Sequence, residues 1–146
     1  MSLEPCHSFQ REIITFVERG IMTPGDHLPP GVALGWATAS EGIVAGFVFT
    51  NWQRSDGVIE VSGYSTRRDW ASKPIVRAIF EYPFDDLGCR MVVARHSVRN
   101  ARVRRIWRAL GADEVILPRM RGDDEDEAVS LFHRDQWRAS RFARKD

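Results

Sequence analysis

The segment NARVRRIWRALGA, residues 100–112, carries the clearest helical pattern in this chain of 146 residues. From Val103 to Leu110 its apolar residues follow the spacing i, i+3, i+4 and i+7, which places them on one face of a helix. Asn100 is a favoured N-cap and Gly111 a favoured terminator, so the sequence marks both ends. The segment therefore predicts a short amphipathic helix.

A strand, a helix and another strand are predicted immediately before this segment. Residues 90–95 have the Met-Val-Val core of a strand, and residues 58–65 are strand-like as well. Between them, apolar residues recur at helical spacing from Pro74, a favoured first-turn residue, and Pro83 is expected to kink or end that helix near Tyr82. A strand–helix–strand unit predicts a parallel crossover, whose ligands usually bind at the carboxyl ends of the strands.

The rest of the sequence predicts a mostly antiparallel sheet. The remaining elements are a helix over 9–19, a loop rich in Pro and Gly over 23–31, strands over 33–39 and 43–52 joined by the Glu41-Gly42 turn, strands over 114–117 and 128–133 around an acidic run, and a final helix over 135–144. No repeat or linker divides the chain, so we expect residues 1–146 to form one domain of mixed α/β (α+β) class.

Composition and charge narrow the class of protein. The chain is 43% hydrophobic with a net charge of +1, and residues 67–108 hold eleven basic side chains against four acidic ones. The near-neutral total argues against nonspecific binding of nucleic acid, whereas the local positive charge suits a compact phosphorylated cofactor. No apolar run reaches the roughly 20 residues of a membrane helix, and the N-terminus lacks the layout of an export signal. Because the only cysteines are Cys6 and Cys89, we expect a cytoplasmic protein with reduced thiols.

In their order and spacing, three parts of the sequence resemble the GCN5-related N-acetyltransferase (GNAT) family. They are Asn100 with Leu110-Gly111, residues 79–84 followed by Leu87-Gly88-Cys89, and Gly46-Phe47-Val48. The resemblance covers roughly residues 34–137 and is nearest to ribosomal-protein N-terminal acetyltransferases and to small acyltransferases of phages and prophages. It implies a GNAT-like fold, a mixed and mostly antiparallel sheet flanked by helices, with a central parallel strand pair, 58–65 and 90–95, splayed around acetyl-CoA. It also implies direct transfer of the acetyl group to a primary amine, without a metal.

The resemblance further implies which residues contact acetyl-CoA: Tyr64, Ser65, Thr66, Arg67, Arg68, Ala71, Ser72, Lys73, Ile75 and Asn100. Backbone N–H groups and the positive end of a helix dipole bind phosphate at such a turn. The sequence departs from the family here, because Ala71 and Lys73 stand where glycines are usual and Pro74 has no N–H. Two interpretations of the turn's cations Arg67, Arg68 and Lys73 stay open: they compensate with side-chain charge, or they are solvated loop residues.

Glu60 is the candidate general base for the attacking amine. It lies between Ile59 and Val61 in its strand, which puts it on one face of the sheet, near the place of the family's catalytic carboxylate. The alternative is an exposed glutamate of the sheet. Asn100 either only caps its helix or also contacts the cofactor. Trp107 stands where many family members have a tyrosine that acts as a general acid, and we expect it to pack in the core.

Other functions remain as alternatives. A catalytically silent binding module of the same fold competes with the enzyme, because the phosphate turn and the acid tyrosine are both altered. Nucleic-acid binding through the arginines of residues 99–108 is disfavoured, because the acidic run 123–127 could pair with them. His96 and Ser97 are candidates for the substrate channel, and the C-terminal strand pair suggests a homodimer. The acceptor stays open among a protein N-terminus, a lysine, a polyamine and a small amine.

Overall fold

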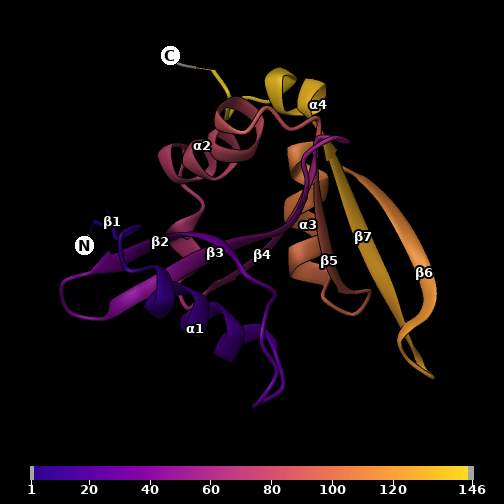
Figure 1. The fold of residues 1–146 in the computed structure, drawn as a ribbon, viewed down its shortest axis with the longest axis horizontal. Helices are drawn as coiled ribbons and strands as arrows, with labels where there is room; N and C mark the ends of the chain where they lie inside the picture. Colours follow the sequence, from indigo (N-terminus) through magenta and orange to yellow (C-terminus); the bar gives the residue numbers. More distant parts are fainter. Residues whose placement is uncertain (1, 145–146) are drawn as a thin grey trace.

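Seven strands form one sheet across the residues that the computed structural model describes, 2–144 (Figure 1). Their order is β1-β2-β3-β4-β5-β7-β6. The strands are β1 (Glu4–Pro5), β2 (Gly31–Thr38), β3 (Gly42–Gln53), β4 (Val58–Ser65), β5 (Met91–Ser97), β6 (Asp113–Gly122) and β7 (Glu125–His133). The helices are α1 (Gln10–Ile21), α2 (Lys73–Glu81), α3 (Ala101–Leu110) and α4 (Arg134–Ala139), with a 3₁₀ turn η1 (Arg68–Trp70) and a π-helical turn η2 (Tyr82–Asp86).

The centre of the sheet is a parallel strand pair that is joined at one end only. β4 and β5 pair through Val58 with Met91, Ile59 with Val92, and Glu60 with Val93. Beyond these three pairs the strands diverge, while β4 stays paired with β3 as far as Ser65 and β5 stays paired with β7 as far as Ser97 (Figure 1). All other strand pairs are antiparallel. The predicted mixed sheet with a splayed parallel pair is therefore confirmed.

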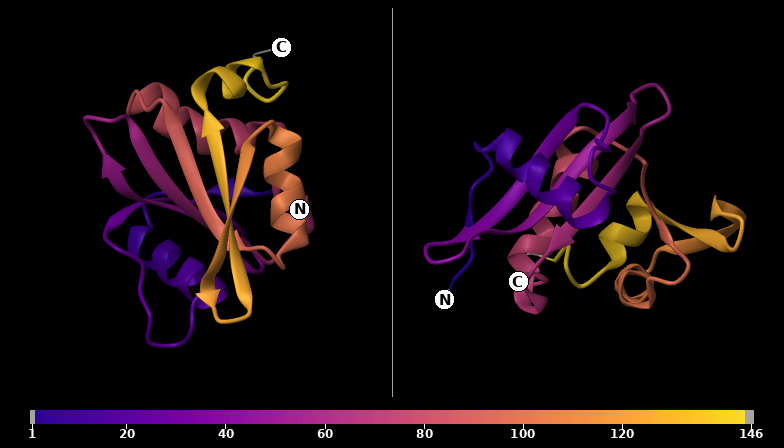
Figure 2. Two further views of the ribbon diagram at one scale, coloured as in Figure 1. Left: turned by 90° about the vertical axis from the view of Figure 1, so that its right-hand side faces the viewer. Right: turned by 90° about the horizontal axis from the view of Figure 1, so that it is seen from below.

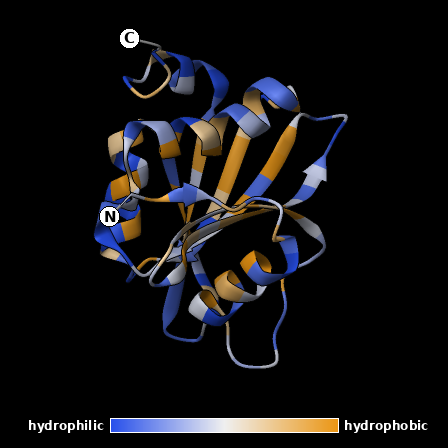
Figure 3. Cartoon of the chain, turned by 90° about the vertical axis from the view of Figure 1, so that its left-hand side faces the viewer, coloured by the Kyte–Doolittle hydropathy of each residue, from blue (hydrophilic) through white to orange (hydrophobic). Residues whose placement is uncertain are grey.

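Helices cover both faces of this sheet (Figures 1 and 2). On one face, Ile13 and Val17 of α1 are completely buried. A Cβ atom on Gly35 of β2 would lie 2.7 Å from Ile13, so a glycine is what lets α1 approach the sheet this closely. On the other face, α2, α3 and α4 enclose an aromatic cluster around Phe80 and Phe132. Hydrophobic residues concentrate along the strands and alternate with hydrophilic ones on α1 and α2 (Figure 3).

The sequence located the main helices well. The side chain of Asn100 accepts a hydrogen bond from the N–H of Val103, and Gly111 ends α3 in the left-handed conformation, φ 99°. α2 gives way to the π-helical turn at Tyr82, as expected from the proline at the next position. Trp107 packs edge-to-face on Phe80 and Phe132, as predicted for a core residue.

One strand was not predicted, and three elements have limits that differ from the expected ones by three residues or more. β6 continues to Gly122 rather than ending at Leu117. β1 was not anticipated, because a strand of two residues has no detectable period. β7 begins at Glu125 rather than after the acidic run, since arginines of β5 and β6 neutralise its buried Glu127. α4 ends at Ala139, and the polypeptide after it packs against α2 through hydrogen bonds that Arg77 donates to backbone oxygens. None of the helices within residues 2–144 combines the length and hydrophobicity that crossing a bilayer requires.

Candidate active site

The place where β4 and β5 diverge is the centre of the candidate site. Along β4, residues 61–65 have no partner in β5, so their backbone groups on that side make no hydrogen bonds to β5. Because side chains alternate along a strand, Glu60, Ser62 and Tyr64 share one face. Tyr64 packs against Phe16 of α1, with ring centroids 5.4 Å apart, so that face is the one covered by α1. The opposite face of β4 packs into the core cluster that α2 and α3 cover.

Glu60 stands at the last register pair before the strands separate. It is half-buried, and its Oε1 accepts a hydrogen bond of 3.1 Å from Nδ2 of Asn51. Asn51 belongs to a bulge in β3, between Thr50 and Gln53, and has a φ of 53°. Asparagine tolerates this left-handed conformation better than most residues do. The bulge thus turns an amide toward the candidate base, a contact that sequence periodicity did not predict.

A cluster of charged residues lies beside Glu60 on the same face. Arg95 is on the part of β5 that no longer pairs with β4, and its Nε and Nη2 donate to Glu127 at 3.0 and 3.2 Å. Nη1 of Arg121 donates to the same carboxylate at 2.9 Å. Glu127 is 1% exposed. The pKa of Arg95 is raised, mainly by its hydrogen bonds to Glu127, with a further contribution from the charge of Glu60.

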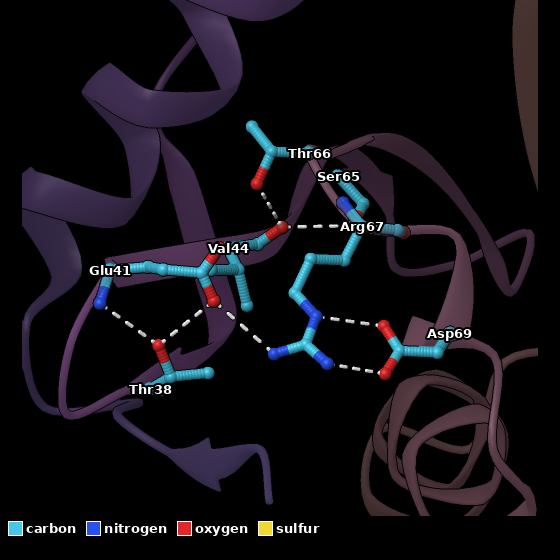
Figure 4. Close-up of polar contacts among 7 residues, drawn as sticks. All are labelled: Thr38, Glu41, Val44, Ser65, Thr66, Arg67 and Asp69. Carbon is cyan, nitrogen blue, oxygen red and sulfur yellow. Dashed lines mark hydrogen bonds and ion pairs between the residues drawn. The ribbon is translucent and has the colours of Figure 1, made fainter. Parts of the chain in front are cut away.

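The turn after β4 is held in shape by polar contacts (Figure 4). The N–H of Thr66 donates to the backbone oxygen of Val44 at 2.9 Å, and the Ser65 hydroxyl accepts from the N–H of Arg67 at 3.1 Å. The Arg67 guanidinium donates to both carboxylate oxygens of Asp69, at 2.8 and 2.5 Å, and to Glu41 at 3.3 Å. These hydrogen bonds hold the pKa of Asp69 below its usual value. Arg67, predicted as a cofactor contact, is therefore already committed to two carboxylates.

A cavity of about 340 Å³ lies where α2 begins, lined by Ala71, Lys73, Arg141 and Phe142. The N–H groups of a first helical turn have no acceptor within the helix. Ser72 is the N-cap residue, whereas the Ile75 side chain is buried, so its backbone is the part that could meet a ligand. Arg68 is exposed on η1. Arg141 brings a second cation to this cavity, which no local motif predicted because it comes from the end of the chain.

A second cavity, of about 550 Å³, lies between α1 and the ends of β3 and β4. Its lining residues are Arg11, Glu12, Thr15, Phe16, Arg19, Gly20, Ile43 and Tyr64. The ring of Tyr64 therefore faces α1, so on the opposite face of β4 only its backbone is available.

The other candidates are distributed over both faces. His96 is buried on the α3 face, its Nε2 has no hydrogen-bond partner among residues 2–144, and burial lowers its pKa. Ser97 donates to Glu125 at 2.5 Å. Trp36 is a core residue, whereas Trp52 is 42% exposed at the β3 bulge. In the described part of the chain, no three His, Cys, Asp or Glu side chains are grouped to hold a metal ion.

Arg99, just before α3, and Arg104 on α3 are paired within the chain. Arg104 donates to Glu114 at 2.9 and 2.7 Å, and Arg99 lies 3.5 Å from Glu125. Part of the acidic run thus neutralises part of this basic segment, as expected.

Comparison with solved structures identifies the fold. A GCN5-related N-acetyltransferase from Brucella melitensis superposes with a TM-score of 0.64 and 21% identity, covering 77% of this chain and 54% of that protein. A protein of T. thermophilus, provisionally described as an acetyltransferase, superposes with a TM-score of 0.63 and 20% identity. The match covers 75% of this chain and 62% of that one. A mutant of the spermidine N-acetyltransferase SpeG from Vibrio cholerae superposes with a TM-score of 0.70 and 12% identity. The match covers 94% of this chain and 97% of that protein.

The matched region spans less than two thirds of the first two of these proteins. No protein-family model and no curated protein matches the sequence. At these identities the likeness establishes the fold, and this chain has the GNAT fold.

Proposed function

We propose that this protein is an N-acetyltransferase that moves the acetyl group of acetyl-CoA to a primary amine. The observation that carries the proposal is the divergence of β4 and β5 immediately after the Glu60–Val93 pair, in a chain with the fold of known acetyltransferases. The divergence leaves backbone groups unpaired in the middle of a sheet, where they would otherwise be satisfied by a neighbouring strand. A ligand that runs along β4 can take the place of that strand.

Acetyl-CoA, when bound, supplies the thioester whose acetyl group is transferred. The backbone of residues 61–65 is suited to hold its pantetheine arm, and the first turn of α2 is suited to its phosphates. Side-chain charge for the phosphates comes from Arg68, Lys73 and Arg141. Ser65 and Thr66 fix the shape of the turn. This set revises the sequence-based one, because Arg67 is neutralised within the turn and Arg141 is added.

Glu60 is the residue proposed to take the proton of the attacking amine. An alkylamine has a pKa near 10 and is mostly protonated at neutral pH, so it must lose a proton to react. In the balanced step, the amine nitrogen forms a bond to the acetyl carbon, the bond from that carbon to sulfur breaks, and the CoA thiolate leaves. Glu60 takes one proton from the ammonium group before the attack, directly or through water, and later releases it to solvent. The second proton leaves the nitrogen as the amide forms and passes, through water, to the departing CoA thiolate. Asn51 acts as a positioning residue because it holds Oε1.

Calorimetry with acetyl-CoA, followed by a thiol-release assay over a panel of amines, tests the proposal. We expect saturable binding and release of CoA with at least one amine. Glu60→Gln is expected to lower kcat by about 10²-fold or more while the Kd for acetyl-CoA changes little. Glu4→Gln, on the edge strand β1, is the matched control and should behave as the wild type. Absence of both binding and thiol release would overturn the proposal.

A binding module without catalysis is the second candidate. The neutralised Arg67 and the missing N–H of Pro74 favour it, because both weaken a phosphate site. Saturable binding of acetyl-CoA without turnover on any amine would favour this candidate. Because one structural neighbour is a spermidine N-acetyltransferase, the amine panel includes spermidine. It also includes peptides with free N-termini, which the resemblance to ribosomal-protein acetyltransferases suggests.

A further inference from the structure

Arg95 is placed where it can contact the acceptor. Val93 pairs with Glu60, and Arg95 follows it by two residues, so Glu60 and Arg95 lie on the same face of the diverging strands. A rise of about 3.3 Å per residue and a strand separation of about 4.8 Å put their Cα atoms roughly 8 Å apart, and more where the strands spread. The Arg95 side chain is 48% exposed on this face.

The guanidinium of Arg95 is held by two hydrogen bonds but keeps a donor nitrogen that neither of them engages. Nε and Nη2 donate to Glu127, while Nη1 makes no hydrogen bond within residues 2–144. Glu127 is shared with Arg121, so two cations surround one buried carboxylate and the cluster keeps a net positive charge. Both guanidinium groups donate to a carboxylate that is 1% exposed, so moving either one away costs hydrogen bonds to a buried charge. The result is a preorganised cation with donors directed to solvent.

Glu60 and Arg95 have opposite charges but do not neutralise each other. Glu60 contributes to the raised pKa of Arg95, yet among the described residues no ion pair within 4.0 Å joins the two side chains. An anion and a cation therefore lie on the same face of the sheet, at the point where β4 and β5 separate. A ligand that complements both must carry an ammonium at one end and an anionic group at the other.

From this arrangement we propose that the acceptor is a small amino acid, whose amine lies beside Glu60 and whose carboxylate is bound by Arg95. The inference rests on the proposed acetyltransferase function and specifies its substrate class. Nη1 of Arg95, which makes no hydrogen bond to Glu127, is the donor left for that carboxylate, and its positive charge strengthens the hydrogen bond. Arg95 is thus a specificity-determining residue, and Glu127 positions it.

Matched acceptor pairs test this assignment. Glycine, β-alanine and 4-aminobutyrate are each compared with the corresponding carboxamide in the thiol-release assay with acetyl-CoA. Because the two amines of a pair have different pKa values, each rate is divided by the deprotonated fraction of its amine at the assay pH. We expect kcat/KM for at least one amino acid to exceed that of its carboxamide by about tenfold or more, the effect of a hydrogen bond to a charged group. The chain length with the largest ratio reports the distance from Glu60 to Arg95.

Substitutions connect the preference to Arg95. In Arg95→Gln the ratio of kcat/KM between an amino acid and its carboxamide is expected to fall close to one. The Kd for acetyl-CoA should stay within about twofold of the wild-type value. Arg102→Gln on α3 is the matched control, and its ratio should be unchanged. Should Arg95→Gln be poorly folded, Arg95→Gln with Glu127→Gln removes both charges of the pair and gives the same readout.

Two results overturn the assignment. An equal rate for acids and carboxamides, or a preference that persists without Arg95, refutes it while leaving the acetyltransferase intact. Failure of the enzyme itself looks different, because acetyl-CoA is then consumed with no amine at all, whether or not it binds.

Discussion

Replacing Glu127 by Gln is expected to destabilise the fold well beyond an ordinary surface substitution. The side chain keeps its size, but one acceptor oxygen becomes an NH₂ group that faces guanidinium donors. Three hydrogen bonds, between 2.9 and 3.2 Å, converge on this carboxylate, which is 1% exposed. Removing one partner of a buried pair costs about 3–5 kcal/mol. The arginines are 48% and 36% exposed and can regain water, so we expect a loss of roughly 2–4 kcal/mol.

Urea denaturation followed by tryptophan fluorescence measures this loss, and a thermal melt should show a drop of roughly 5–15 °C. Glu125→Gln is the matched control on the same strand, because its carboxylate is 30% exposed and lies 3.5 Å from Arg99. We expect less than about 1 kcal/mol for it. A double-mutant cycle with Arg95→Gln then separates the pair's coupling from the effects of each change. Equal losses in Glu127→Gln and Glu125→Gln would refute the reasoning.

Four further predictions concern packing, capping, the cofactor and pH. Gly46→Ala places a Cβ 2.9 Å from a buried valine of α1 and should cost about 1–3 kcal/mol in urea titrations; an unchanged midpoint would contradict the tight packing of α1. Asn100→Ala should cost about 1 kcal/mol and Asn100→Asp less, and an acetyl-CoA affinity lowered in both would add a cofactor contact to the cap. Lys73→Ala and Arg141→Ala should each weaken acetyl-CoA binding and reduce its dependence on salt, whereas calorimetry with unchanged constants would remove them from the site. Burial lowers the pKa of His96, so below pH 6.5 protons bind preferentially to the unfolded chain; stability should fall as the pH drops from 7 to 5, and less steeply in His96→Gln.

Local signals explain what the sequence could predict. Asn100 and Gly111 act within one helical turn of their own positions, so the limits of α3 were correct. The alternation around Glu60 fixed its face without any tertiary information. The divergence of β4 and β5 was expected through resemblance to a family, since nothing in residues 58–65 or 90–95 states that the strands separate.

Long-range contacts explain what the sequence could not. In the sequence, Glu127 is one of several acidic residues in a charged run. Only the pairing of β5 with β7 brings it next to Arg95, 32 positions away in the chain. Arg141 reaches the start of α2 because the polypeptide after α4 folds back. Asn51 meets Glu60 through a bulge, and strand periodicity gives no sign of one. In each case the partners are ordinary polar residues whose meaning depends on topology.

The three register pairs between β4 and β5 also bear on motion. They connect the β1–β4 half of the sheet with the β5–β7–β6 half along one short seam, so small rotations about that seam widen or narrow the opening at its far end. Amide protons of residues 61–65 that lack a cross-strand acceptor should exchange with solvent deuterium faster than those of the seam. A ligand bound between the two halves would slow that exchange and reduce the relative motion of the two parts of the sheet.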